Sequence, residues 1–310
     1  MKLKNEDVLS VKGKGFLRNR GTDLFSGRVV PRGTVFSAKD FAALARVAEE
    51  YGNGKLICTS RQSVEIPGIP FESIPLATAA LREVGLSFGG TGPKVRPITA
   101  CKGTTCVYGN FDTQALAQQI HDEFYIGYSD VKLPHKFKIG IGGCPNSCMK
   151  PSLNDFGIEG RKTPVLDPSL CRGCAVCSVE KHCSMKAACM AEGRISIREE
   201  ACLSCGVCTG KCPFGAVSQE AKTEYRITLG GTWGKRTRMG TPLSRLVSRE
   251  EILPLLEKVI LWFRENAYEK ERLGMAIDRL GMEALEEALF SEELLARKDA
   301  ILAAPLRSRP

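Results

Sequence analysis

The chain has 310 residues, 43% of them hydrophobic, and a formal net charge of +9 at pH 7. This length allows one large domain or two small ones, with ample material for a buried core. No window approaches the roughly 18 uninterrupted apolar residues of a membrane span, and the polar start has no stretch typical of a signal peptide. We therefore expect a cytoplasmic protein. It lacks the aromatic-interleaved basic runs that bind single-stranded nucleic acid, so no such partner is expected.

The first hundred residues alternate between strand and helix signals. A capping box and a hydrophobic staple around Ser37 predict a helix over 38–51. A β-rich run follows at 55–60, and a second helix is expected to begin near Pro75. This order predicts an α+β fold with a ferredoxin-like half over residues 1–90.

A second α/β unit is expected to comprise residues 91–160 and, after an interruption, 223–310. A helix over 113–124 and a strand over 136–141 would place several cysteines at its loop edges. The C-terminal part is predicted to be helical.

The helix near Ile252 is expected to begin in one of two ways. Either Ser248 is its N-cap, or Pro254 lies in its first turn. Residues 275–303 are expected to form two further short helices that pack in the core.

The interruption, residues 161–222, carries most of the cysteines. In a reducing compartment close spacings of this kind favour metal thiolates over disulfides. Its two runs, Cys171-x2-Cys174-x2-Cys177 and Cys202-x2-Cys205-x2-Cys208-x3-Cys212-Pro213, follow the pattern of bacterial ferredoxins with two [4Fe-4S] clusters. A zinc site with four ligands would not require doubled triplets followed by Cys-Pro. We therefore expect an inserted two-cluster ferredoxin domain.

In this pattern three cysteines of each run bind one cluster, and the fourth crosses to the other cluster. One cluster would use Cys202, Cys205 and Cys208, and Cys212 would cross to join Cys171, Cys174 and Cys177. The crossing ligand of the first run is either Cys183 or Cys189. An alanine four residues after Cys183, matched by one four residues after Cys212, favours Cys183.

Two close cysteine pairs lie before the insertion, Cys101 with Cys106 and Cys144 with Cys148. Together they can hold one more [4Fe-4S] cluster. Lys136 and Lys138 are two residues apart on a predicted strand, so their side chains should point to the same face and can hold an anion. A cluster beside an anion pocket indicates the reduction of a small oxyanion.

These motifs resemble those of the sirohaem-dependent sulfite and nitrite reductases, especially the anaerobic C-subunit type with its ferredoxin insertion. The resemblance runs through six segments, 27–33, 59–62, 95–101, 133–138, 144–148 and 155–158. It implies that the two cysteine pairs hold a cluster and that Cys148 bridges this cluster to the sirohaem iron.

The resemblance also assigns roles to basic residues. It implies that four of them bind the anionic substrate and pass on protons, namely Arg28, Arg61, Lys136 and Lys138. Arg96 would bind sirohaem carboxylates. Arg32 is an alternative to Arg28, because one residue more than usual separates Arg28 from the following proline. Asn146 would either line the haem edge or make the turn between two cysteines, and His135 is left without a role.

The resemblance implies a sulfite reductase that carries out a six-electron reduction of sulfite to sulfide, with electrons relayed through two ferredoxin clusters to a coupled sirohaem-[4Fe-4S] centre. The alternatives are an ammonia-forming nitrite reductase and a non-catalytic electron-transfer subunit. Three clusters take twelve of the fourteen cysteines, and the two that are left are Cys58 and Cys189. Cys189 is a spare, and Cys58 is expected to be a core thiol.

The electrons must come from another protein, because the glycine-rich residues 89–92 lack the fingerprint of a dinucleotide site. The donor implied is a ferredoxin, or a flavin subunit with an iron-sulfur subunit. The unit present once here is duplicated in single-chain assimilatory enzymes. A homo- or hetero-oligomer is therefore expected.

Overall fold

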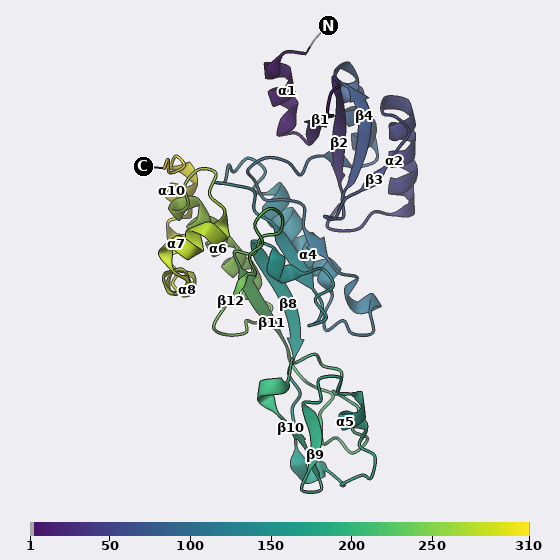
Figure 1. Ribbon diagram of the computed structural model, residues 1–310, viewed down its shortest axis with the longest axis vertical. Helices are drawn as coiled ribbons and strands as arrows, with labels where there is room; N and C mark the ends of the chain where they lie inside the picture. The colour runs from purple at the N-terminus through teal and green to yellow at the C-terminus, as the bar shows by residue number, and fades with distance from the viewer. Residues whose placement is uncertain (1–2, 310) are drawn as a thin grey trace.

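The computed structural model describes residues 3–309, which form three units that follow one another along the longest axis of the molecule (Figure 1). Within these residues, none of the helices combines the length and apolar character needed to cross a membrane.

The first unit is an antiparallel sheet with helices packed against it. Its elements are α1 (Asn5–Lys12), β1 (Phe16–Arg18), β2 (Leu24–Val30), α2 (Ala38–Tyr51), β3 (Ile57–Cys58), β4 (Val64–Pro70), α3 (Ile74–Glu83) and β5 (Ser87–Phe88). The strand order is β1-β2-β4-β3, and β5 also pairs with β2. Phe25, Leu44 and Ile66 are fully buried in the core of this unit.

The helix predicted over 38–51 is confirmed, including its N-terminal cap. The Ser37 Oγ accepts the N–H of Asp40 at 3.1 Å, and the Asp40 carboxylate accepts the N–H of Ser37 at 2.7 Å. The rings of Phe36 and Phe41 lie 5.5 Å apart, as a hydrophobic staple requires.

The strand expected at 55–60 is shorter than predicted. Only β3 forms, and it lies at the edge of the sheet, where it pairs with β4 alone. Cys58 is exposed there, so the expectation of a core thiol was wrong. An edge strand of two residues lacks the second neighbour and the covering helix that would bury its side chains.

The second unit contains a mixed sheet. Its strands are β6 (Thr99–Ala100), β7 (Ile139–Gly142), β8 (Phe156–Lys162), β11 (Thr223–Leu229) and β12 (Thr241–Pro242). They run in the order β12-β11-β8-β7-β6. The strands β6, β7 and β8 are parallel to one another, β11 is antiparallel to β8, and β12 is antiparallel to β11. Parallel neighbours bring the segments that follow β6 and β7 to the same edge of the sheet.

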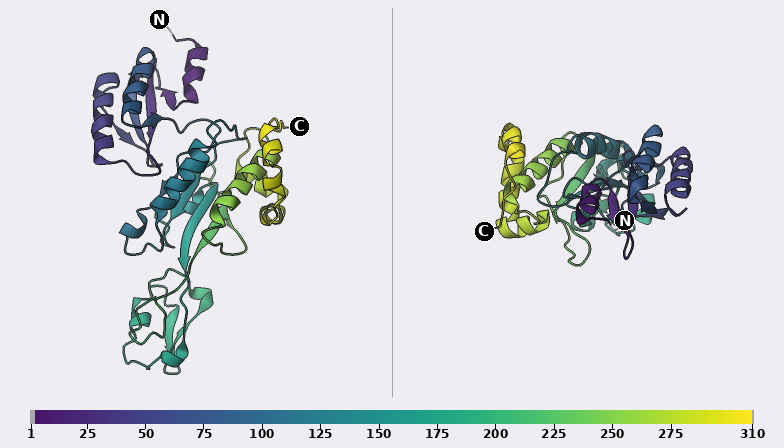
Figure 2. Two further views of the ribbon diagram at one scale, coloured as in Figure 1. Left: turned by 180° about the vertical axis from the view of Figure 1, so that it is seen from behind. Right: turned by 90° about the horizontal axis from the view of Figure 1, so that it is seen from above.

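Helices flank this sheet in both views of the molecule (Figures 1 and 2). They are α4 (Thr113–Ile120), which continues as a π-helical turn over His121–Ile126, then α6 (Ile252–Asn266), α7 (Leu273–Leu280), α8 (Met282–Phe290), α9 (Glu293–Ala296) and α10 (Lys298–Ala303). Four short helices, α7 to α10, thus occupy the region where two were expected.

Of the two starts proposed for α6, the one with Pro254 in the first turn is confirmed, whereas the N-cap is Glu251 and not Ser248. The Glu251 carboxylate accepts the N–H of Ser248 at 2.7 Å, and the helix begins at Ile252 with Pro254 in its first turn. The first turn tolerates proline because its N–H has no partner within the helix there.

The strand expected over 136–141 begins only at Ile139. The preceding residues are extended, but only one isolated parallel bridge, between Phe137 and Val95, continues the ladder. The lysines at 136 and 138 therefore lie beside this bridge rather than inside a regular strand.

The third unit is a small lobe between β8 and β11. It contains α5 (Ser178–His182) and a hairpin formed by β9 (Ala188–Ala191) and β10 (Arg194–Ile197). Figure 1 shows it projecting from the ends of β8 and β11, on the side away from the first unit. The buried side chains of its core are only Val179, Ala188, Ile195, Ala216 and Val217, and partly buried cysteines pack around them. So small a core is typical of folds held together by bound metal groups.

Candidate active site

A cavity of about 700 Å³ lies between the first and second units. None of its lining residues, as far as the structure describes the chain, is acidic, and seven are lysines or arginines, namely Lys12, Arg28, Arg61, Arg96, Lys136, Lys138 and Lys270. All five arginines and lysines singled out in the sequence for the substrate or for sirohaem line this one cavity. Such a concentration of positive charge suits a ligand that carries several negative charges.

Arg61 enters the cavity on a loop of the first unit that inserts into the second. The Gln62 side chain in this loop bonds both backbone groups of Ala100, accepting its N–H at 2.9 Å and donating to its carbonyl at 2.8 Å. Arg61 donates to the carbonyls of Pro97 at 2.6 Å and Ile139 at 3.1 Å. Its guanidinium is therefore fixed by backbone groups, while its buried Nε has no partner among residues 3–309.

A short stretch of parallel backbone pairing holds Arg96 beside Lys136 and Lys138. The Arg96 N–H donates to the Phe137 carbonyl at 2.8 Å, and the Phe137 N–H donates to the Lys94 carbonyl at 3.0 Å. The Phe137 ring is fully buried in the core. Because neighbouring residues of an extended chain point to opposite faces, Lys136 and Lys138 both point toward the cavity, as predicted from their spacing.

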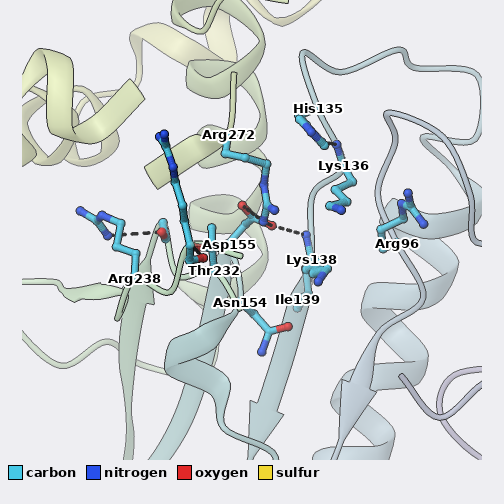
Figure 3. A network of polar contacts seen from close by, with 12 residues as sticks. Arg96, His135, Lys136, Lys138, Ile139, Asn154, Asp155, Thr232, Arg238 and Arg272 are labelled. Carbon is cyan, nitrogen blue, oxygen red and sulfur yellow. Dashed lines mark hydrogen bonds and ion pairs between the residues drawn. The ribbon is translucent and has the colours of Figure 1, made fainter. Parts of the chain in front are cut away.

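A buried carboxylate supports this segment from behind (Figure 3). Asp155 is fully buried, accepts the N–H of Lys138 at 2.8 Å, and accepts two bonds from Nη2 of Arg272 at 2.9 and 3.0 Å. Burial raises the pKa of Asp155, and the nearby Arg272 opposes this rise. The pair ties the sheet to the C-terminal helices directly behind the cavity.

Burial and crowded positive charges lower the pKa values of both cavity lysines. Burial, followed by the charges of Arg61 and Arg272, lowers the pKa of Lys138 to about 8. Burial and the Arg272 charge also lower the pKa of Lys136. A lysine whose pKa lies near 8 can donate a proton close to neutral pH.

His135 also lines the cavity. Burial and the charges of Arg272 and Lys136 lower the pKa of His135 to about 4. Its Nδ1 accepts the N–H of Lys136 at 2.7 Å, so the neutral ring carries its proton on Nε2. The imidazole is therefore an uncharged hydrogen-bond donor at neutral pH.

The two candidate arginines of the first unit differ in position. Arg28, on β2, lines the cavity, and it donates to the Glu65 carboxylate from Nε at 2.9 Å and from Nη2 at 2.6 Å. Its Nη1 donates to the Gly90 carbonyl at 3.1 Å. The Arg32 side chain is 60% exposed and lies 3.5 Å from Asp40, outside the cavity. Only Arg28 can reach a ligand bound there.

Both cysteine pairs of the second unit lie at the edge where parallel strands end. Cys101 follows β6 directly, and Cys144 follows β7. The Cys101 Sγ accepts the N–H of Gly143 at 3.2 Å. Burial raises the pKa of Cys144, and the thiols of Cys101, Cys106 and Cys148 raise it further.

Asn146 does not line the basic cavity. It lies with Cys144 in a separate cavity of about 190 Å³, whose other walls include Leu203 and Cys205 of the lobe. Of the two alternatives for Asn146, the structure therefore favours a place in the turn between the cysteines over the edge of the large cavity.

In the lobe, Cys183 lies with the second cysteine run. One small cavity is lined by four thiols, those of Cys183, Cys202, Cys205 and Cys208. Burial raises the pKa of Cys208 to about 11, with further increases from the thiols of Cys205, Cys202 and Cys183. Cys189 instead lies on β9, paired across the hairpin with Ser196.

The remaining cysteines of the runs surround the small core of the lobe. Cys171, Cys177 and Cys212 pack against it, whereas Cys174 is exposed. The Cys171 Sγ accepts the N–H of Ile195 at 3.3 Å. Among residues 3–309, no three Cys, His, Asp or Glu side chains meet closely enough to hold a single metal ion. Sets of four cysteine thiolates are the usual ligands of [4Fe-4S] clusters.

The sequence patterns did not predict three basic residues that lie in or near the cavity, Lys12, Lys270 and Arg272. Lys12 ends α1, and the other two precede α7, far along the chain from every motif. No local pattern marks them, because only the packing of the C-terminal helices and α1 brings them to the cavity.

A basic cavity between two α/β units, in a chain that also carries two close cysteine pairs, is typical of a redox protein that holds an anionic cofactor and an iron-sulfur cluster. Residues 91–298 match the family described as nitrite and sulphite reductase 4Fe-4S domain, and residues 18–84 match the nitrite/sulfite reductase ferredoxin-like half domain. The chain therefore belongs to the nitrite and sulfite reductase family.

The curated relatives include sulfite reductases. The chain is 33% identical over 291 residues to the coenzyme F420-dependent sulfite reductase of Methanocaldococcus jannaschii, covering 89% of this chain but only 44% of that protein. It is 32% identical over 296 residues to the C subunit of the anaerobic sulfite reductase of Salmonella typhimurium, covering 87% of this chain and 79% of the relative. The chain thus spans less than half of the first relative and most of the second.

The fold is similar to that of a crystal structure of dissimilatory sulfite reductase I, with a TM-score of 0.68 at 19% identity over 93% of this chain and 72% of the other. The expected fold, a ferredoxin-like half joined to a 4Fe-4S domain of the sulfite reductase type, is confirmed.

Proposed function

We propose that this chain reduces sulfite to sulfide at a sirohaem coupled to a [4Fe-4S] cluster. The observation that carries the proposal is the convergence of Arg28, Arg61, Lys136 and Lys138 in one basic cavity, in a chain whose relatives include sulfite reductases. Hydrogensulfite takes up six electrons and six protons to give HS⁻ and three waters. Its site must therefore bind an anion and supply protons repeatedly.

Two sets of residues would hold the cofactors. Cys101, Cys106, Cys144 and Cys148 would bind the cluster, with Cys148 shared with the sirohaem iron. Sirohaem, when bound, supplies an iron that accepts the substrate and transfers electrons to it. Its carboxylates suit the guanidinium fork of Arg96, which lines the cavity. Lys12 and Lys270, on the cavity lining, would neutralise further carboxylates.

The basic side chains have distinct roles in this proposal. Arg61 is fixed by backbone carbonyls and presents a permanent charge that orients the anion. Arg28 faces the same space from β2, where Glu65 holds its guanidinium. Lys138, with its lowered pKa, donates protons as oxygen leaves as water, and Lys136 assists from the same face.

The lobe would carry electrons to this centre. We propose one cluster held by Cys171, Cys174, Cys177 and Cys212, and a second held by Cys183, Cys202, Cys205 and Cys208. Cys205 of the second group lines the 190 Å³ cavity together with Cys144, which favours a place for this group next to the catalytic cluster. The first group would then receive electrons from a partner, either a ferredoxin or flavin and iron-sulfur subunits. Assembly into a homo- or hetero-oligomer is part of the same proposal.

Steady-state assays with both candidate anions test this function. The cofactor-loaded chain, reduced by a viologen dye without oxygen, should form sulfide from sulfite with a higher kcat/KM than it shows for nitrite. A Lys138→Met variant with unchanged sirohaem content should lose most of this activity. A strong preference for nitrite, or bound sirohaem with no turnover of either anion, would overturn the proposal.

A further inference from the structure

Besides its two connecting strands, the lobe has a loop that is hydrogen-bonded to the second unit. This loop, residues 202–206, carries two of the cysteines that line the small cavity of the lobe. Lys162 N–H donates to the Ser204 carbonyl at 2.7 Å, and Asn110 Nδ2 lies 3.4 Å from the Cys205 carbonyl. A Cβ on Gly206 would lie 2.8 Å from the Asn110 side chain, so the contact is tight.

A buried ion pair lies under this contact. Glu159 and Arg161 are two residues apart on β8, so they share a face, and they are only 8% and 9% exposed. They form a salt bridge with each other. Arg161 also donates to the carbonyl of Leu203 in the lobe loop, and the Glu159 carboxylate accepts the hydroxyl of Ser147. Ser147 lies between Cys144 and Cys148, so the four residues connect two cysteine loops.

Both loops are held in an unusual backbone conformation. Ser147 and Ser204 have φ angles of 51° and 50°, in the left-handed region that non-glycine residues adopt at a cost. Each persists only where surrounding contacts determine it, and here the contacts come from Glu159 and from Lys162. The ion pair therefore supports the first loop at Ser147 and contacts the second loop at Leu203, so that it links the two loops.

We infer that Glu159 and Arg161 form a clamp that holds the Cys202–Cys205 loop of the lobe against the Cys144–Cys148 loop, and so sets the distance that electrons cross between them. The inference rests on the proposed function for its electron-transfer part. Each transfer moves one electron, which oxidises the donor group in the lobe and reduces the acceptor group beside Cys144. Tunnelling weakens steeply with distance, and two strands alone would allow the lobe to pivot. Glu159 and Arg161 are positioning residues, since neither lines the basic cavity.

Amide hydrogen exchange tests the clamp without any cofactor chemistry. In Arg161→Ala, exchange at Lys162 and in residues 202–206 should rise about tenfold or more, because the docked state opens more often. Exchange in the β9–β10 hairpin should not change. Arg226 is the matched control, since it is exposed and is the register partner of Glu159 on the neighbouring strand β11. Arg226→Ala should leave exchange at Lys162 unchanged.

Arg161→Ala leaves a buried carboxylate unpaired and can unfold the chain, so a second variant is needed. The double variant Glu159→Gln/Arg161→Met removes both charges at similar volume, keeps an acceptor for Ser147, and loses the bond to Leu203. In Arg161→Lys, the lysine can contact either Glu159 or the Leu203 carbonyl at one time. Its exchange rate at Lys162 should therefore lie between those of the wild type and Arg161→Ala.

Electron delivery is the second measurement, made on protein with unchanged iron and sirohaem content. Stopped-flow reduction of the cavity cofactor through the lobe should slow about tenfold in the double variant, and magnetic coupling between the neighbouring clusters in EPR should weaken. Faster exchange with unchanged electron delivery, or unchanged exchange at Lys162, would overturn the inference. A protein that binds no sirohaem would refute the proposed function, whereas the exchange result would still decide whether the clamp exists.

Discussion

Asp155 and Arg272 are 117 residues apart in the chain and form a buried ion pair directly behind Lys138. The carboxylate of Asp155 also accepts the Lys138 N–H, so one acidic group links the sheet, the C-terminal helices and the cavity wall. The pair gives the C-terminal helices, where the sequence indicates no chemistry, a role in supporting the candidate active site.

Removing Arg272 should destabilise the protein strongly. In Arg272→Ala, Asp155 would remain fully buried without its partner, and we expect the free energy of unfolding to fall by about 3–5 kcal/mol. Urea denaturation of the cofactor-free chain measures this. Lys132→Ala is the control, because its bridge to Glu269 is exposed and should contribute only about 0–1 kcal/mol. Equal small effects in both variants would show that the buried pair is not a structural support.

Sulfite binding should depend on the charge of Lys138. Burial and neighbouring arginines lower its pKa to about 8, so the side chain is charged below this pH and neutral above it. The contribution of Lys138 to affinity should therefore be complete near pH 7 and disappear as the pH rises past 8. Titration calorimetry at several pH values measures it, as the difference between the wild type and Lys138→Met.

Sulfite itself also titrates, but its titration affects the wild type and Lys138→Met equally. It therefore cancels in the difference between their affinities. Lys138→Arg should keep its charge, and so its contribution to affinity, at the higher pH. A difference between wild type and Lys138→Met that does not change with pH would mean that the lysine does not titrate in this range.

Arg28 and Arg32 should respond differently to substitution. Arg28→Ala should weaken sulfite binding about tenfold or more, because Arg28 lines the cavity. Arg32→Ala should change the affinity less than about twofold, because its side chain is 60% exposed and faces Asp40. Equilibrium titration of both variants decides between them, and an effect confined to Arg32 would reverse the assignment.

The two candidate crossing cysteines should differ in iron content. Cys183→Ser should lose about one cluster's iron, since Cys183 shares a cavity with Cys202, Cys205 and Cys208. Cys189→Ser should keep all clusters, because that residue lies in the β9–β10 hairpin. Iron and acid-labile sulfide analysis of anaerobically purified protein measures this. Loss of a cluster from Cys189→Ser alone would reverse the choice of ligand.

Part of the fold and part of the site could be predicted because their signals are local. The cap at Ser37 is a pattern of neighbouring residues, and the shared face of Lys136 and Lys138 follows from the geometry of extended chains. The structure bears out both.

The remaining features depend on contacts between distant segments. The pairing of Asp155 with Arg272 and the arrival of Lys270 at the cavity require the packing of C-terminal helices, which no local pattern encodes. Cys58 illustrates the converse. Its apolar neighbours predict burial, but its strand lies at the edge of the sheet, and edge position is a property of topology rather than of local sequence.

The composition of the anaerobically purified protein tests the central claim most directly. Absorption and EPR spectra, with iron and sirohaem quantified, should show one sirohaem coupled to a [4Fe-4S] cluster and two further clusters in each chain. Addition of sulfite should perturb the sirohaem spectrum. Iron-sulfur clusters without any sirohaem would contradict the claim, and would leave a multi-cluster electron carrier in place of a reductase.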